Sequence, residues 1–442
     1  MKLNKQFPFL LIIIATLGAC KKDRSEVIVP PGLLEPLENN GKDTLSVGES
    51  LRLHPKLNGN QNTTYTWMIN GQPSGTDSVF AFNPTARGDF KIDFKATNVS
   101  GEVVAAYNLH VLGKYENGFF VVNEGWFGHG TGTVSFYRYD TKKMEDSLFT
   151  KENPGKDIEP KTSTLESGVL FGDKFYLISK VGGPMVVTDK YSLKETARIP
   201  SQGGNDWRSF VGISMDKGLI SAQSGLYPIN LNTLQISTKL AGVTGQIGDL
   251  LKAGNYVFAL SATQGVVIIN ATTNAVEKTI SGVVVGFTQT PDGAVWAAGG
   301  TKLYKIDPES LTIQSYDSPF SIFGSWAAWH PGSITASKKE NAVFIARNGS
   351  FSGGTQVYKY IPGDASSLQT PFITLPAGKI LYGSGIAFDN KLNQVILNTV
   401  QSGFGDNFRV NNMYFHDATT STLKDTYTYD GFYFPSIMVP HQ

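Results

Sequence analysis

Side chains that could perform catalysis are spread along this sequence without the spacing that a shared site requires. Its six histidines, at positions 54, 110, 129, 330, 416 and 441, include no pair at the spacing of metal ligands. No Gly-x-Ser-x-Gly elbow, phosphate-binding loop or Asp-rich calcium loop is present. Glu124, between an apolar run and a glycine-rich loop, could act as a base, although a carboxylate at a strand end is more often solvated or capping. We therefore predict a protein that is not an enzyme and needs no metal ion or cofactor.

Large aromatic side chains gather instead in segments whose other residues are typical of loops. The stretch "NEGWFGHGTG" at 123–132 has two of them among glycines, and amide and guanidinium groups accompany the rings elsewhere. Such a surface suits a large, flat, partly apolar ligand. For any single ring, packing inside the fold is the alternative interpretation. The predicted ligand-binding residues are Trp126, Phe127, Trp207, Arg208, Trp326, Asn348, Phe351, Tyr382, Phe404, Phe408 and Arg409.

Repeated units of four short strands must position these loops. Asn230, Asn270 and Asp307 end equivalent strands and lie 40 and 37 residues apart, close to the period of about 40 to 45 residues that is typical of propeller blades. Counting a partial unit at Gly118 gives seven blades. That unit lacks a first strand, and "FYFPSIMVPHQ" at the C-terminus has no strand after it. We therefore predict that the C-terminal segment completes the first blade and closes the ring.

The aromatic loops are of two kinds that share one face of a propeller. In a four-stranded blade, the loop between strands two and three and the link to the next blade emerge on the same side. The remaining turns, such as "NATTNA", "DPESLT" and "DATTST", emerge on the opposite side and are mostly polar. The sequence therefore predicts one aromatic face, suited to binding, and one polar face.

Composition supports an all-β chain and excludes one class of partner. The 442 residues carry 38 Lys and Arg against 37 Asp and Glu, with no basic tract beyond the first residues, which argues against nucleic acid as a partner. Aromatic residues at 12% and 47 glycines favour many short strands with tight turns. The predicted fold is all-β, with an N-terminal Ig/PKD-like β-sandwich at 33–113 and a seven-bladed β-propeller at 114–442.

The N-terminal segment predicts export and anchoring. Two lysines precede an apolar run at 7–17 that is short for a bilayer span, so residues 1–19 are predicted to be a lipoprotein signal peptide. "LGAC" resembles a bacterial lipobox, in which Cys20, the only cysteine, is lipidated. Residues 20–32 are rich in charge and proline, as a tether would be. "CKKD" resembles an export tag, so the predicted location is the outer membrane, exposed at the cell surface.

Two resemblances extend this interpretation. The Trp67 strand and "ARGDFKIDFKATNVSG" resemble Ig-like PKD domains, and a spacer is the simplest role for that module. "GFFVVNEGWFGHGTGTVSFYRYD", the strand ends "IN" and "ID", and the terminal "FPSIMV" resemble surface lipoproteins with a YncE-like seven-bladed propeller, the DUF5074 and cobalamin-capturing lipoprotein group. The resemblance covers about 118–440.

The resemblance implies a function for the aromatic face. Within the group, that face grips a corrinoid and passes it to a TonB-dependent outer-membrane transporter. Cobalamin brings its own metal and axial base, so no protein ligand to cobalt is required. The implied ligand is cobalamin or a similar large nutrient, and the implied partners are that transporter and, through the lipid anchor, the membrane. Capture of a glycan or a protein by the same face is the alternative, and an enzyme such as a propeller lyase or hydrolase comes third.

Overall fold

A computed structural model describes residues 27–324, 332–349 and 353–442. The predicted signal peptide at 1–19 and Cys20 lie outside the described residues. Two compact units make up the chain, Met1–Val111 and Leu112–Gln442, against a predicted boundary after residue 113. Almost all regular structure in both is β, which confirms the predicted fold class. No helix in the described ranges has the length and apolar character needed to cross a membrane.

The N-terminal unit is an antiparallel sandwich. Its elements are β1 (Gly32–Leu33), the 3-10 helix η1 (Glu38–Gly41), β2 (Lys42–Ser46), β3 (Leu51–Leu53), β4 (Leu57–Asn58), β5 (Thr64–Ile69), β6 (Gln72–Gly75), β7 (Phe80–Phe82), β8 (Gly88–Asn98) and β9 (Gly101–Leu112). The main sheet has the order β2-β9-β8-β5-β6, and β3 pairs with β7. Trp67 on β5 is fully buried, its ring centroid lies 5.3 Å from that of Phe80, and its Nε1 donates to the Asp77 carbonyl at 2.7 Å.

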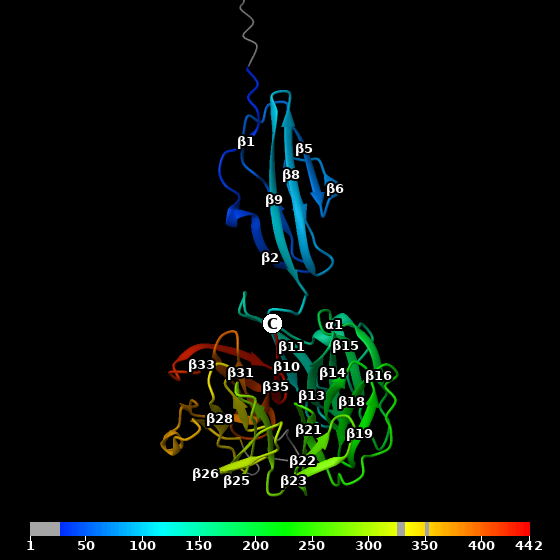
Figure 1. The fold of residues 1–442 in the computed structure, drawn as a ribbon, viewed down its shortest axis with the longest axis vertical. Helices are drawn as coiled ribbons and strands as arrows, with labels where there is room; N and C mark the ends of the chain where they lie inside the picture. Colours follow the sequence, from blue (N-terminus) through cyan, green and yellow to red (C-terminus); the bar gives the residue numbers. More distant parts are fainter. Residues whose placement is uncertain (1–26, 325–331, 350–352) are drawn as a thin grey trace, which may run out of the picture. The chain divides into compact units, whose positions relative to one another are not determined.

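The C-terminal unit consists of seven antiparallel sheets in its described part, each forming one blade (Figure 1). Blade 1 contains β10 (Gly118–Asn123), β11 (Thr133–Arg138), β12 (Lys143–Glu145) and β35 (Pro435–His441). Blade 2 contains β13 (Thr164–Phe171), β14 (Lys174–Lys180), β15 (Met185–Asp189) and β16 (Glu195–Ile199). Blade 3 contains β17 (Trp207–Ser214), β18 (Lys217–Ala222) and β19 (Gly225–Asn230). Blade 4 contains β20 (Ile247–Ala253), β21 (Tyr256–Ser261), β22 (Gly265–Asn270) and β23 (Val276–Ile280).

Blades 5 to 7 follow in chain order. Blade 5 contains β24 (Val285–Gln289), β25 (Val295–Ile306) and β26 (Ile313–Ile322). Blade 6 contains β27 (Ile334–Ala336), β28 (Val343–Ala346), β29 (Gln356–Tyr360) and β30 (Ile373–Thr374). Blade 7 contains β31 (Lys379–Asp389), β32 (Gln394–Gln401), β33 (Val410–Asp417) and β34 (Leu423–Asp430). Short helices α1 (Leu148–Glu152), η2 (Ala365–Leu368) and η3 (Gly405–Arg409) lie in the connections. The long strand β25 supplies the two middle strands of blade 5, because it turns back at Gly300 and pairs with both β24 and β26.

The last strand closes the ring, as the sequence predicts. β35 pairs antiparallel with β10, with Val121 opposite Met438 and Val122 opposite Ile437. Every residue of β10 is buried. Blade 1 therefore combines strands from both ends of the propeller, and β35 covers the edge of β10 that would otherwise be open for pairing with another chain.

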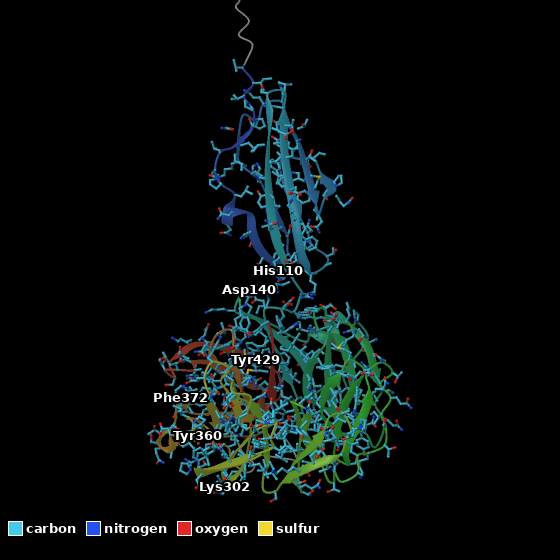
Figure 2. The ribbon with its side chains drawn as sticks, viewed as in Figure 1. His110, Asp140, Lys302, Tyr360, Phe372 and Tyr429 are labelled. Carbon is cyan, nitrogen blue, oxygen red and sulfur yellow. The ribbon has the colours of Figure 1, made fainter. Side chains whose placement is uncertain are left out.

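Side chains fill the spaces between neighbouring blades (Figure 2). Both faces of a middle strand are covered by adjacent blades, so these strands are apolar throughout rather than alternating. In blade 4, for example, Val257, Phe258, Val267 and Ile268 are all fully buried. The hydrophobic cores run from blade to blade around the ring.

Antiparallel pairing divides the connections between two faces. The loop face, as we call it, holds the loops between strands two and three and the links between blades, including 124–132, 402–409 and 431–434. The turn face holds the remaining turns, including 190–194, 271–275, 307–311 and 418–422. Because β10 is a second strand, the chain enters the propeller on the turn face.

Local turn chemistry explains the repeat visible in the sequence. The Asn270 side-chain oxygen accepts from the backbone N–H groups of Thr272 and Thr273. In the same way, the Asp307 carboxylate accepts from the backbone N–H groups of Glu309 and Ser310. Asn230 and Asp417 repeat the pattern in other blades. Asn and Asp favour this arrangement because their short side chains mimic a backbone turn.

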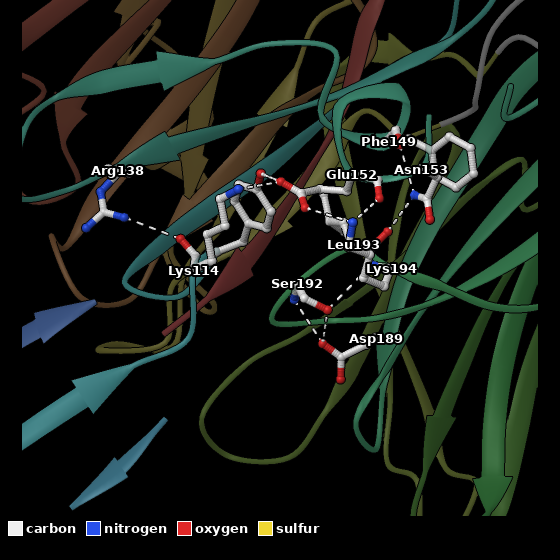
Figure 3. Close-up of polar contacts among 10 residues, drawn as sticks. Lys114, Arg138, Phe149, Glu152, Asn153, Asp189, Ser192, Leu193 and Lys194 are labelled. Atoms are coloured by element: carbon white, nitrogen blue, oxygen red, sulfur yellow. Dashed lines mark hydrogen bonds and ion pairs between the residues drawn. The ribbon is translucent and has the colours of Figure 1, made fainter. Parts of the chain in front are cut away.

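Polar contacts fix the start of the propeller on the turn face (Figure 3). The Lys114 ammonium and the buried Tyr115 hydroxyl both donate to Oε1 of Glu152, at 2.5 and 2.7 Å. Lys194, from the turn before β16, donates to the Glu152 carbonyl. The Asn153 amide donates to the Phe149 and Leu193 carbonyls at 2.9 Å. These contacts join the entering chain to blades 1 and 2.

Candidate functional site

Six rings from three loops form an aromatic cluster on the loop face. Its members are Trp126, His129, Phe404, Phe408, Tyr433 and Phe434. The three loops are 124–132, 402–409 and 431–434. Ring closure brings the first and the last of them together, because the Glu124 and Gly125 N–H groups donate to the Phe434 and Tyr433 carbonyls at 2.9 and 3.1 Å.

Trp126 lies at the centre of this cluster. Its ring stacks on His129 at a centroid distance of 4.0 Å and meets Tyr433 edge to face at 5.1 Å. Phe404 and Phe408 approach it at 6.0 and 6.3 Å, also edge to face. These are favourable geometries for aromatic pairs. The cluster therefore holds its own shape.

Part of the surface around this cluster is apolar and open to solvent. The Phe404 side chain is 79% exposed and that of Phe127 is 50% exposed. The Arg409 guanidinium lies over the Tyr433 ring, with Cζ 5.4 Å from the ring centroid. Grouped exposed rings beside a cation are typical of a surface that contacts another molecule.

Glycine at 125 lets the Trp126 loop turn this tightly. Its φ is +81°, in the left-handed region, and a Cβ there would lie 2.7 Å from the Gly130 carbonyl oxygen. The Trp126 N–H donates to the same carbonyl at 3.0 Å. A loop that carries large rings can therefore form only because its glycines accept these conformations.

The other predicted binding residues have different places. Trp207 is 7% exposed and packs in the core between blades, so it leaves the candidate set. Asn348 is 5% exposed, donates to Ser333 Oγ and accepts from the Gly354 N–H, both at 2.8 Å, which makes it a structural residue. Trp326 and Phe351 lie outside the described residues.

Charged side chains are buried at the loop-face ends of blades 1 to 3. We call this group the charged cluster: Glu124, Glu159, Glu166, Lys180 and Arg208, each less than 10% exposed. Lys180 Nζ lies 2.6 Å from Glu124 Oε1 and 2.6 Å from Glu166 Oε2. Arg208 Nη1 lies 3.9 Å from Glu166 Oε1. The prediction of a ligand-binding Arg208 is therefore corrected, because this side chain lies in the internal network. Glu124, for which the sequence left a base or a solvated or capping carboxylate open, is also buried in this network.

Two β-bulges introduce charges into otherwise apolar inner strands. Pairing skips one residue between Leu165 and Ser167 in β13, and one between Trp207 and Ser209 in β17. The skipped residues are Glu166 and Arg208. A bulge turns the extra side chain away from the regular alternation. In the sequence, these bulges are signalled by a charged residue at the same point of two successive repeats.

Burial dominates the titration of the acids in the charged cluster. It raises the pKa of Glu124 to about 7, against the lowering effect of Lys180. It also raises the pKa of Glu159 to about 8, although the Gly132 N–H donates to this carboxylate at 2.5 Å. For Lys180 burial acts downward, but Glu124 and Glu166 outweigh it and raise the pKa.

The charged cluster supports the aromatic cluster directly. Glu124 begins the Trp126 loop, and Glu159 holds the N–H of Gly132 at the loop's end. Tyr382, on inner strand β31, hydrogen-bonds to the Glu124 carboxylate and stacks on Phe434 at 4.2 Å. Burial raises the pKa of Tyr382, with the Glu124 charge adding to the effect. Tyr382 therefore connects the two clusters rather than offering a free ring.

Replacing Glu159 with Gln should flatten the pH dependence of stability. Because its folded pKa of about 8 exceeds the ordinary 4.5, the neutral form stabilises the fold below pH 4.5, and this contribution is lost as pH rises through 8. Glu159→Gln mimics the neutral acid, so its gain in unfolding free energy over wild type should be larger at pH 9 than at pH 5, by on the order of 4 kcal/mol. The control is exposed Glu277→Gln on β23. Equal curves for Glu159→Gln and wild type would contradict the assignment.

The inner strands enclose a central cavity of 410 Å³. Ser167, Ser209, Asp249 and Lys252 supply its polar lining, and Phe210 and Phe287 part of its apolar lining. Among the described residues no group of three or more His, Cys, Asp and Glu side chains could hold a metal ion. The arrangement on the loop face is suited to holding a ligand against rings.

The closed ring of blades and its aromatic loop face define this unit as a β-propeller with a candidate binding face. Residues 117–441 match the family model described as a domain of unknown function, DUF5074. The chain therefore belongs to the DUF5074 family. No match is found among curated proteins.

One solved structure shows the same fold at low identity, and two others are matched with lower TM-scores. A quinonprotein alcohol dehydrogenase-like protein from Bacteroides thetaiotaomicron is 17% identical, with a TM-score of 0.62, over 93% of this chain and 99% of that chain. The dihydro-heme d1 dehydrogenase NirN is 12% identical with a TM-score of 0.46, over 71% of this chain and 73% of its own. PorZ of Porphyromonas gingivalis is 12% identical with a TM-score of 0.41, over 80% and 43%. At such identities the first likeness shows the fold alone.

Proposed function

We propose that this protein is a non-enzymatic ligand-binding propeller that captures a large, flat, partly apolar molecule on its loop face. The observation that carries the proposal is the aromatic cluster, in which Phe404 is exposed and the Arg409 guanidinium lies over the Tyr433 ring. A flat ligand can lie on such rings while the guanidinium binds an oxygen at its edge. The rings of the cluster already pack on one another without a ligand, which lowers the entropy cost of capture.

Cobalamin, or a similar large nutrient, is the first ligand we propose. The sequence resembles the group that captures corrinoids, and the ligand's amide-fringed macrocycle suits rings flanked by polar side chains. Transfer to a TonB-dependent outer-membrane transporter belongs to the same proposal. A glycan or a protein bound on the same face is the second candidate, favoured by the polar pocket described below.

We also propose that the chain is anchored through lipid on Cys20 and displayed at the outer-membrane surface, with the N-terminal sandwich as a PKD-like spacer. The lipobox-like "LGAC" and the following "KKD" support this proposal. Membrane fractionation tests it, because Cys20→Ala should move the protein to the soluble fraction. Continued membrane retention of that variant would contradict the lipid anchor.

Truncating Phe404 should weaken ligand binding without weakening the fold. The side chain is 79% exposed, so Phe404→Ala removes contact area but little packing. We expect the Kd for cyanocobalamin to rise about tenfold, equivalent to about 1.4 kcal/mol, with an unchanged Tm. The measurement is calorimetric titration, with haem and oligosaccharides tested in parallel. The matched control is Met215→Ala, which removes a 72% exposed side chain from the turn face. Equal losses in both variants would contradict binding on the loop face.

A further inference from the structure

A polar pocket of 270 Å³ borders the aromatic cluster. It lies between the 124–132 loop and the 431–434 link, so its walls come from both ends of the propeller chain. Its lining includes Asn123, His129, Thr131, Thr133, Arg409 and Tyr433. Tyr433 belongs to the aromatic cluster as well. The pocket and the cluster can therefore contact one ligand at the same time.

Asn123 contributes a buried amide that is only half satisfied. The residue is 1% exposed, and its Nδ2 donates to Thr133 Oγ1 at 3.0 Å and to Ser135 Oγ at 3.1 Å. Its Oδ1 has no hydrogen-bond partner among the described residues. Leaving a buried acceptor unpaired costs about 1 to 3 kcal/mol.

Arg409 brings donors to the rim of the same pocket. Its guanidinium makes no ion pair or hydrogen bond within the described part of the chain, and it is held in place over the Tyr433 ring. The Tyr433 hydroxyl donates to Asp406 Oδ1 at 3.4 Å, which fixes the ring from its other end. The pocket is thus lined by guanidinium donors, threonine hydroxyls and an aromatic ring.

This combination matches the chemistry of a sugar ring. Sugar hydroxyls both donate and accept, so they can pair with the Thr131 hydroxyl and with the Arg409 guanidinium, and the apolar C–H face of the sugar can pack on the Tyr433 ring. At 270 Å³ the pocket is smaller than the range of about 300 to 1,000 Å³ that is typical of sites for drug-sized ligands, so it suits one such ring. We propose that this pocket binds a single sugar ring of the ligand held by the aromatic cluster.

The proposal deepens the proposed function and rests on ligand capture at the loop face. A sugar ring could reach the pocket from two sources. One is the ribose in the nucleotide arm of a cobalamin whose macrocycle lies on the aromatic cluster. The other is a terminal sugar of a glycan whose next residues lie on the same rings.

Binding of cyanocobalamin, of cobinamide, which lacks the nucleotide arm, and of methyl glycosides and ribose tests the pocket. If the sugar belongs to a corrinoid, wild-type protein should prefer cyanocobalamin over cobinamide by about tenfold or more. Arg409→Ala and Thr131→Val should each lower that ratio severalfold. Lys339→Ala removes an exposed, unpaired charge from the turn face and should leave the ratio unchanged.

The possible results distinguish a failure of the sugar pocket from a failure of ligand capture on the loop face. Saturable glycoside binding that depends on Arg409, with no corrinoid binding, supports the pocket and rejects cobalamin. Equal affinity for the two corrinoids, without sugar binding, overturns the pocket and leaves corrinoid capture standing. If none of the probes binds, the proposed sugar pocket is wrong, and so is the proposed capture of a corrinoid or a glycan.

Discussion

Deleting residues 435–442 should sharply reduce the stability of the propeller. The deletion removes β35, the inner strand of blade 1, and exposes β10 as an open edge. Met438 is buried, and Ile437 and Val439 pack against the core between blades 1 and 2. Burial of three such side chains is worth on the order of 5 kcal/mol. We therefore expect a fall in Tm of about 10 °C or more in a thermal unfolding experiment.

Removing Gln442 alone is the matched control, because this exposed residue follows β35 and its loss leaves the pairing with β10 intact. Its Tm should stay within about 2 °C of wild type. An unchanged Tm in the larger deletion would show that the ring does not depend on closure by the C-terminal strand.

The second large effect should come from Lys180→Met. The substitution leaves Glu124 and Glu166 buried without their shared cation, which typically costs about 3 to 5 kcal/mol. The loss should be largest at pH 8, where Glu124 is ionised, and smaller at pH 5.5, below its pKa of about 7. Adding Glu124→Gln should restore part of the lost stability at pH 8. Denaturant unfolding at both pH values measures these differences.

An exposed ion pair provides the comparison. Lys302 and Asp317 lie 2.8 Å apart with side chains 46% and 86% exposed, so Lys302→Met should cost no more than about 1 kcal/mol at either pH. Similar small losses in Lys180→Met and Lys302→Met would contradict the account of the charged cluster.

The sequence predicts the ring well because its repeat has a local cause. Asn270 and Asp307 form the same side-chain-to-backbone turn, so the sequence of these blades marks the end of the third strand within a few residues. Closure also follows from the sequence, since an unpaired strand at each end must find a partner. Convergence of Trp126, Phe404 and Phe408 depends on that closure, which places blade 1 beside blade 7.

The buried interactions escape a sequence-based prediction because they depend on long-range pairing. Glu124 comes from the loop after β10, whereas Lys180 and Glu166 come from β14 and β13, and nothing in any one segment shows that their charges meet. Trp207 lies in a segment whose composition is typical of a loop, yet the bulge after it leaves the ring in the core between blades. The direction in which a side chain points at the end of a strand decides whether it packs in the core or can contact a ligand, and β-bulges set that direction.

Hydrogen exchange with and without ligand tests the central claim that the loop face is the binding face. The experiment uses the probe that binds most tightly among cyanocobalamin, haem and the oligosaccharides, at saturating concentration. The account predicts slower exchange in 124–132, 402–409 and 431–434, and no change in the turns 271–275 and 307–311. Protection confined to the turn face, with the ligand bound, would contradict it.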